Sequence, residues 1–104
     1  MRYPVVLHND PNSDYGVTIP DLPGCFSAGA SIDEALESAV EAAECHVEGL
    51  LTDSEDIPLP AAIESHQEDS SFSDGIWAFI DVNLSKLSGE VRRMKLEAAI
   101  QKRE

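Results

Sequence analysis

The sequence is poor in basic residues. Its 104 residues contain seven Lys and Arg against 20 Asp and Glu, which gives a formal net charge of −13. The basic residues are also unevenly placed. Residues 1–85 contain one basic residue, Arg2, and seventeen acidic residues, whereas residues 86–104 contain six basic and three acidic residues. Such an acidic surface repels nucleic acid and attracts basic molecules. Charge alone leaves a second explanation open, in which acidity only keeps a small protein soluble.

Cysteine and long apolar runs are also scarce. Cys25 and Cys45 form no metal-binding pattern, and we interpret them as reduced, partly buried thiols. No apolar run approaches the ~20 residues that span a bilayer, and no basic start precedes an apolar stretch. These features predict a cytoplasmic protein that makes no membrane contact. Hydrophobic residues still make up 42% of the chain, enough for one globular domain.

Patterns for catalysis are missing as well. The three histidines lie far apart, no glycine-rich loop suits a phosphate, and no glycine elbow surrounds a serine. A two-metal nuclease site would need converging carboxylates, for which the candidates are Asp10, Asp14, Asp21 and Asp81. The first three fall in turns, where bonding of the side chain to the backbone already explains an aspartate. The sequence therefore predicts no catalytic residue, no metal and no cofactor, and hence no enzyme.

The first half of the chain carries clear strand and turn signals. Residues 3–8, 15–19 and 25–30 are predicted strands, and Pro4 indicates a sheet edge or a strand start. The dipeptide Pro23-Gly24 fits the centre of a type II turn, because proline presets φ and glycine supplies the positive φ.

A long helix is predicted over residues 32–51. Ser31 followed by Glu34 is a capping box, which marks the start of the helix. Apolar side chains recur at helical spacing and should face the sheet: Leu36, Ala39, Val40, Ala43, Val47 and Leu50.

Five glutamates recur at the same helical spacing. They are offset from the apolar stripe by one residue, about 100° around the helix: Glu34, Glu37, Glu41, Glu44 and Glu48. Like charges at this spacing repel by ~0.2–0.5 kcal/mol per pair, and the helix has no Lys or Arg to relieve them. We interpret the row as a docking ridge for a cationic partner, with Asp14 and Asp21 in the turns as further partner-binding candidates. An ordinary solvated face is the alternative.

The second half is predicted to return to the sheet. Residues 57–60 should be extended because they contain two prolines, residues 61–66 form a helical turn, and residues 67–75 a polar loop. Residues 76–82 are the fourth strand. The crossover through the helix predicts that this strand is parallel to its neighbour, and its two apolar faces predict a central position. The fold class is thus α+β, in the order β-β-β-α-β, with a three-to-four-stranded sheet covered by one long helix.

This pattern resembles the N-terminal domain of the HicB-type antitoxin family over residues 1–87. The resemblance rests on a series of short motifs: Tyr15 and Val17, Pro20–Cys25, Ser27–Gly29, Glu34–Ala35 with Ala39 and Ala43, Ile57–Pro60 and Trp77–Val82. It implies a partial ribonuclease H-like topology. It also implies an antitoxin of a type II toxin–antitoxin pair, which occludes a small basic mRNA-cleaving toxin, HicA, and assembles as a dimer or tetramer. The alternative is a stand-alone regulatory or small-ligand-binding remnant of such a domain.

Residues 88–104 are predicted to be a separate, basic C-terminal segment. Members of this family usually carry a ribbon-helix-helix or helix-turn-helix element after the first domain. Here the segment is either one terminal helix or the truncated start of such an element. Eight residues remain after Leu96, too few for two helices, so we assign no DNA-binding residue and expect no operator binding by this chain.

Overall fold

The structure is a computed structural model that describes residues 1–9 and 14–83. Its elements follow in the order β1 (Arg2–Asn9), β2 (Tyr15–Thr18), β3 (Phe26–Gly29), α1 (Ile32–Thr52), α2 (Ile63–Gln67), η1 (Ser70–Phe72, a 3₁₀ turn) and β4 (Ile76–Asp81). The predicted α+β class and its β-β-β-α-β order are confirmed. The predicted domain boundary after residue 87 and the segment 88–104 lie outside the described residues.

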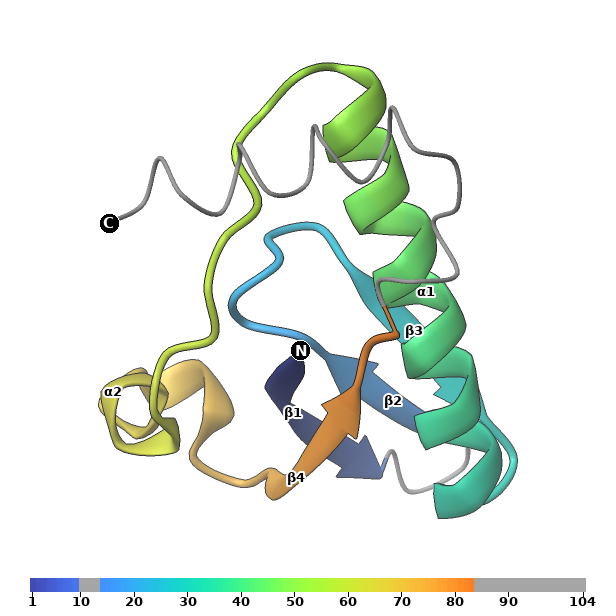
Figure 1. Ribbon diagram of the computed structural model, residues 1–104. Helices are drawn as coiled ribbons and strands as arrows, with labels where there is room; N and C mark the ends of the chain where they lie inside the picture. The colour runs from blue at the N-terminus through green and yellow to red at the C-terminus, as the bar shows by residue number, and fades with distance from the viewer. Residues whose placement is uncertain (10–13, 84–104) are drawn as a thin grey trace.

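The four strands form one antiparallel sheet in the order β3-β2-β1-β4. Helix α1 lies across one face of this sheet (Figure 1). Strand β1 is central and its residues 3–7 are buried on both faces, with Tyr3, Val5 and Leu7 in the core under α1. Pro4 is paired with β4 alone, because the ladder between β1 and β2 covers only residues 6–9 of β1. Pro4 is therefore the third residue of an inner strand, where the sequence predicted a sheet edge or a strand start, and the ladder with β2 does not reach it.

The turn and the helix start form as the sequence predicts. Gly24 has φ +84°, the conformation that a type II turn requires at its third position. Ser31 is the N-cap of α1, and its hydroxyl oxygen accepts a hydrogen bond from the Glu34 N–H at 3.1 Å. The Glu34 carboxylate reaches one residue further back than in the usual capping box, and accepts from the Ala30 N–H at 3.1 Å.

The buried face of α1 is rotated from the predicted stripe. Ala39, Ala43 and Val47 are buried as predicted, and with Ala35 and Leu51 they form the line that lies on the sheet. Leu36, Val40 and Leu50 are only half-buried. The physical reason is size, since a row of alanines lets the helix backbone approach the sheet closely and moves the larger side chains to the flanks.

The position predicted for the fourth strand is wrong. Strand β4 is antiparallel to β1 and lies at the edge of the sheet, where a parallel, central strand was expected. Residues 53–75 cause the difference, because they lead the chain away from α1 and reverse it through α2 and η1 before β4 begins (Figure 1). Both faces of β4 are still apolar, since Ile80 packs into the core and Trp77 lies against α2 and η1.

One hydrogen bond and two ring contacts hold the connection between α1 and β4 against the strands. The Tyr3 hydroxyl donates to the Pro58 carbonyl at 2.7 Å. The His66 ring stacks on Trp77 with 6.3 Å between centroids, and the edge of Phe72 meets the same indole at 5.8 Å. The predicted loop over residues 67–75 therefore contains an ordered 3₁₀ turn, η1, packed beside β4.

Candidate protein-docking surface

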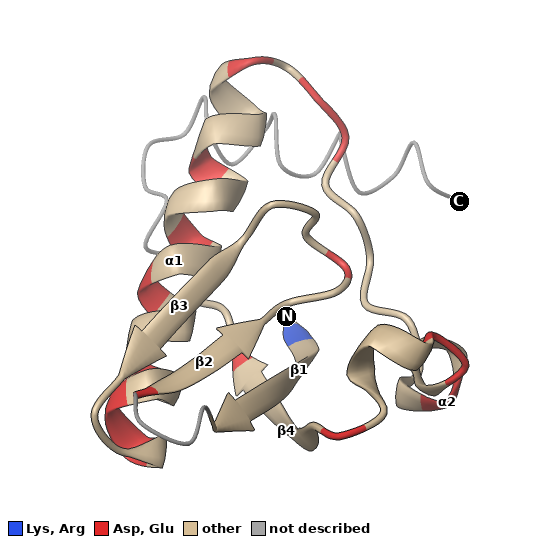
Figure 2. Cartoon of the chain, turned by 180° about the vertical axis from the view of Figure 1, so that it is seen from behind, with Lys and Arg blue, Asp and Glu red and all other residues tan. Residues whose placement is uncertain are grey.

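Acidic side chains of the described residues gather on α1 and on the loops that follow it. Figure 2 shows that the strands contain few charged residues and that Asp and Glu positions recur along the helix behind them. Within residues 1–9 and 14–83, Arg2 is the only Lys or Arg, and its guanidinium lies 4.5 Å from the centre of the Phe79 ring. This part of the molecule is thus strongly negative, and six of its acidic residues lie on α1.

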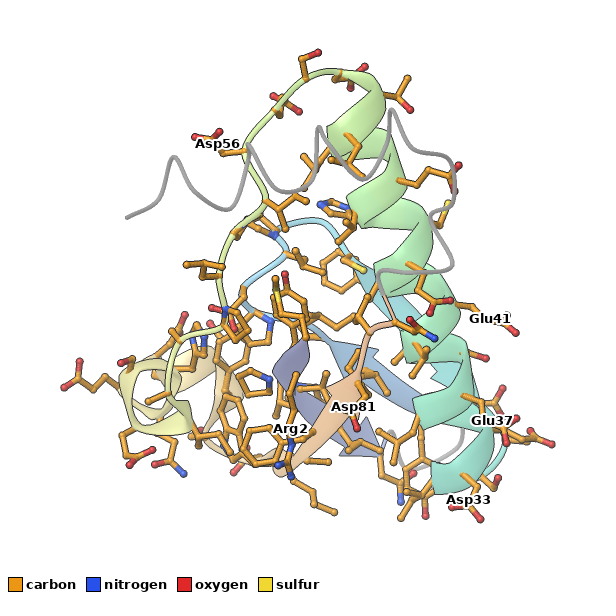
Figure 3. All side chains as sticks on the ribbon, in the orientation of Figure 1. Arg2, Asp33, Glu37, Glu41, Asp56 and Asp81 are labelled. Carbon is orange, nitrogen blue, oxygen red and sulfur yellow. The ribbon has the colours of Figure 1, made fainter. Side chains whose placement is uncertain are left out.

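The exposed carboxylates of α1 form a row along its outer side. Figure 3 shows Asp33, Glu37 and Glu41 pointing away from the sheet. All three are exposed, whereas Glu44 and Glu48 are half-buried further along the helix. We call these five residues the acidic ridge. Glu34, a predicted member of the row, is exposed as well, but its carboxylate caps the helix start.

Asp33 is the residue of the ridge that the sequence prediction missed. It precedes Glu37 by four residues, the spacing that places two side chains on one helix face, so a usable signal was present.

The two turn aspartates predicted to bind a partner are placed differently. Asp14 is exposed immediately before β2. The Asp21 side chain is only 6% exposed, and its Oδ1 lies 3.0 Å from His66 Nε2 and accepts from the Ala61 N–H at 3.1 Å. Asp21 therefore ties the Pro-Asp-Leu-Pro-Gly turn to the segment around α2. A role of either residue in partner binding stays a prediction.

Cys25 and Cys45 line one recess of about 270 Å³ beside the turn, together with Gly24, Phe26, Ala42 and His46. Cys25 is buried and Cys45 is exposed. Burial raises the pKa of the Cys25 thiol above its ordinary value, and the neighbouring Cys45 adds to the rise. Over residues 1–9 and 14–83, no group of three or more His, Cys, Asp or Glu is arranged to hold a metal ion.

The two thiols should differ in reactivity. We expect iodoacetamide to alkylate Cys45 at least about tenfold faster than Cys25 at pH ~8, because the thiolate is the reactive form and Cys25 is both shielded and harder to ionise. Mass spectrometry of the modified peptides measures the two rates. In urea the difference should disappear, and equal rates in the folded protein would contradict the placement of Cys25.

The sequence matches a family model described as HicB-like antitoxin of bacterial toxin–antitoxin systems over residues 3–101. It is 38% identical over 96 residues to an uncharacterised 14.9 kDa protein of Haemophilus phage HP1, covering 92% of this chain and 71% of that protein. It is 35% identical over 88 residues to antitoxin HicB of Escherichia coli K12, covering 85% of this chain and 56% of that antitoxin.

Solved structures show the same relationship. The antitoxin HicB of Burkholderia pseudomallei superposes with a TM-score of 0.75 at 32% identity, covering 99% of this chain and 86% of that one. The N-terminal domain of the same antitoxin gives 0.69 at 34% identity, covering 81% of this chain and all of the domain.

The fold, four antiparallel strands with one long helix before the last strand, is that of the HicB N-terminal domain. The chain belongs to the HicB-like antitoxin family of bacterial toxin–antitoxin systems, a non-enzymatic family. Among the residues that the structure describes, no helix is long and apolar enough to cross a membrane.

Proposed function

We propose that this chain is the antitoxin of a type II pair and that it binds and occludes a small basic, mRNA-cleaving toxin of the HicA type in the cytoplasm. A structural neighbour supports the choice of partner: the HicA3–HicB3 toxin–antitoxin complex contains a chain that superposes with a TM-score of 0.67 at 26% identity. The chain spans 56% of the E. coli antitoxin HicB that it matches. The activity of a whole antitoxin is therefore part of the proposal.

The acidic ridge is the observation that carries this proposal. Three exposed carboxylates at four-residue spacing stand on a helix that is anchored to the sheet by a buried alanine face. Their mutual repulsion is not relieved by any cation of the helix, which makes a cationic partner favourable there. The ridge would speed the encounter with a basic toxin, and apolar contacts formed afterwards would set the lifetime of the complex.

Charge reversal on the ridge tests the proposal. The triple variant Asp33→Lys, Glu37→Lys, Glu41→Lys should associate with the purified toxin about 10- to 100-fold more slowly at low salt, because the steering field is removed. The loss should shrink as salt screens the remaining charges. The melting temperature should stay the same or rise, since repulsion along the helix is relieved. Stopped-flow binding over a salt series, beside thermal melting, measures both effects.

A matched control keeps the total charge change and moves it off the ridge. The variant Glu64→Lys, Glu68→Lys, Asp74→Lys alters three exposed acidic residues of the connection around α2 and η1. It should slow association much less than the ridge variant. Equal slowing by the two variants would show that net charge acts and the ridge does not. A second experiment expresses the chain together with its neighbouring genes. If no small basic protein copurifies with the chain, the alternative of a stand-alone regulatory domain is favoured.

A further inference from the structure

Two aromatic rings form walls of a recess between η1 and the start of β4. The recess has a volume of about 380 Å³ and is lined by Gln67, Phe72, Ser73, Gly75 and Trp77. The rings of Phe72 and Trp77 are nearly perpendicular, with 83° between their planes and 5.8 Å between their centroids. Both residues are half-buried, so a molecule in the recess would meet ring surface on two sides.

The indole of Trp77 is held in place by contacts outside the recess. The His66 ring stacks on it, with 11° between the ring planes and 6.3 Å between the centroids. His66 is held in turn by Asp21, whose Oδ1 lies 3.0 Å from His66 Nε2 and whose side chain is only 6% exposed. One aromatic wall is therefore formed before any ligand arrives, which lowers the entropy cost of binding.

The segment that forms the recess is strongly acidic. Residues 63–75 contain no Lys or Arg and four exposed acidic residues, which are Glu64, Glu68, Asp69 and Asp74. Two of these directly follow polar residues of the lining, since Glu68 comes after Gln67 and Asp74 after Ser73. Figure 2 shows the Asp and Glu positions of this segment around α2. A positively charged ligand is therefore attracted to this side of the molecule.

We propose that the recess binds an ammonium group of a small aliphatic diamine or polyamine. The faces of aromatic rings attract organic cations, and tryptophan attracts them most strongly. The side-chain oxygens of Gln67 and Ser73 can accept hydrogen bonds from the N–H groups of a primary ammonium. The second ammonium group of the ligand then meets the carboxylates of the same acidic segment.

Size and position favour a free amine over a side chain of the basic toxin. The volume of about 380 Å³ lies within the range of small-molecule sites, roughly 300–1,000 Å³. The toxin is attracted to the acidic ridge on α1, and Figures 1 and 2 show α1 and α2 at opposite sides of the molecule. This inference does not rest on the proposed function, because the amine would bind the chain without any toxin.

Fluorescence of Trp77 tests the proposal directly, because Trp77 is the only tryptophan of the chain. Putrescine added to the full chain at constant ionic strength should give a saturating change, with a Kd of about 1 mM. Spermidine, which carries a further positive charge, should bind about tenfold more tightly.

Two matched probes separate the contributions to binding. Mg²⁺ has the charge of putrescine without its carbon chain, and butanediol has the carbon chain without the charge. Neither should reproduce the saturating change. An equal response to Mg²⁺ would show that only net charge acts, and an equal response to butanediol would show that the rings bind any apolar molecule. Either result, or no response to putrescine, would overturn the proposal.

Substitution of Phe72 tests the aromatic wall. Phe72→Leu keeps an apolar side chain but removes the ring, and should weaken putrescine binding by about fivefold. Phe26→Leu is the matched control, since Phe26 is 64% exposed on β3, away from the recess, and its loss should leave the Kd unchanged. Thermal melting verifies that both variants fold. Equal Kd values for the two folded variants would contradict a role of the ring.

A pair of double variants tests the carboxylates at exposed positions, where the fold is not at risk. Glu68→Gln with Asp74→Asn should weaken putrescine binding by about tenfold, because it removes the two charges next to the lining. Glu37→Gln with Glu41→Gln changes the net charge equally on the acidic ridge and should have little effect. Equal weakening by both pairs would show that the total charge of the chain, and not this recess, attracts the amine.

A final titration distinguishes the recess from the toxin-docking surface. Putrescine should bind the ridge variant Asp33→Lys, Glu37→Lys, Glu41→Lys, and it should also bind the chain in complex with the toxin. If the toxin prevents putrescine from binding, a side chain of the toxin occupies the recess and the proposal of a free amine is wrong. If the chain binds no toxin, putrescine binding should persist, so the two proposals fail separately.

Discussion

Gly29→Ala is expected to lower the free energy of unfolding by about 3 kcal/mol, an unusually large loss for one methyl group. Gly29 is the last residue of β3 and lies directly under the first turn of α1. A Cβ atom there would come 2.4 Å from the Ala35 nitrogen and 2.7 Å from the Glu34 carbonyl carbon. Both are backbone atoms, so no side chain can turn aside, and the helix would have to move off the sheet.

Gly49→Ala is the matched control for this substitution. Gly49 lies on the exposed side of α1, and a Cβ there meets no atom within 4 Å. Alanine should therefore stabilise the domain by about 0.5–1 kcal/mol, through its higher helix propensity. Urea unfolding of both variants measures the two changes. Equal effects of the two substitutions would show that α1 does not approach β3 as closely as described.

Val47→Asp is expected to abolish stable folding. Val47 is fully buried between α1 and the sheet, so the substitution removes an apolar side chain and leaves a carboxylate without a partner in the core. A loss of about 3–5 kcal/mol is typical of an unpaired buried charge. A small domain has only about 5–15 kcal/mol in total, so much of the protein should be unfolded or insoluble at 37 °C.

Two further variants on the same helix are the controls for Val47→Asp. Leu50→Asp should be tolerated better than Val47→Asp, because Leu50 is half-buried at the flank of the helix. Glu41→Lys should fold normally, since Glu41 is exposed on the acidic ridge. Circular dichroism during thermal melting ranks the three variants. If Leu50→Asp is the most damaging, α1 faces the sheet with the apolar stripe that the sequence predicts and not with its alanine face.

Much of the candidate docking surface could be predicted from the sequence. Helix period alone aligns the glutamates, and no cation on α1 interrupts the row. Burial could not be predicted in this way, because it depends on how close the helix lies to the sheet. That distance decides that Glu44 is half-buried while Glu37 is exposed. Asp21 likewise meets His66 only because the connection after α1 folds back onto the turn.

The sequence by itself determined every feature that depends on neighbours along the chain. Gly24 supplies the positive φ of the turn, Ser31 caps the helix, and alternating or periodic apolar residues define four strands and α1. Only the tertiary structure decided how these elements combine. The small side chains of Ala35 and Ala39 rotate the helix onto its alanine face, and the connection 53–75 delivers β4 antiparallel to β1 at the sheet edge. Local sequence patterns indicate which surfaces are apolar. Which segment of the chain covers each surface depends on residues far away in the sequence.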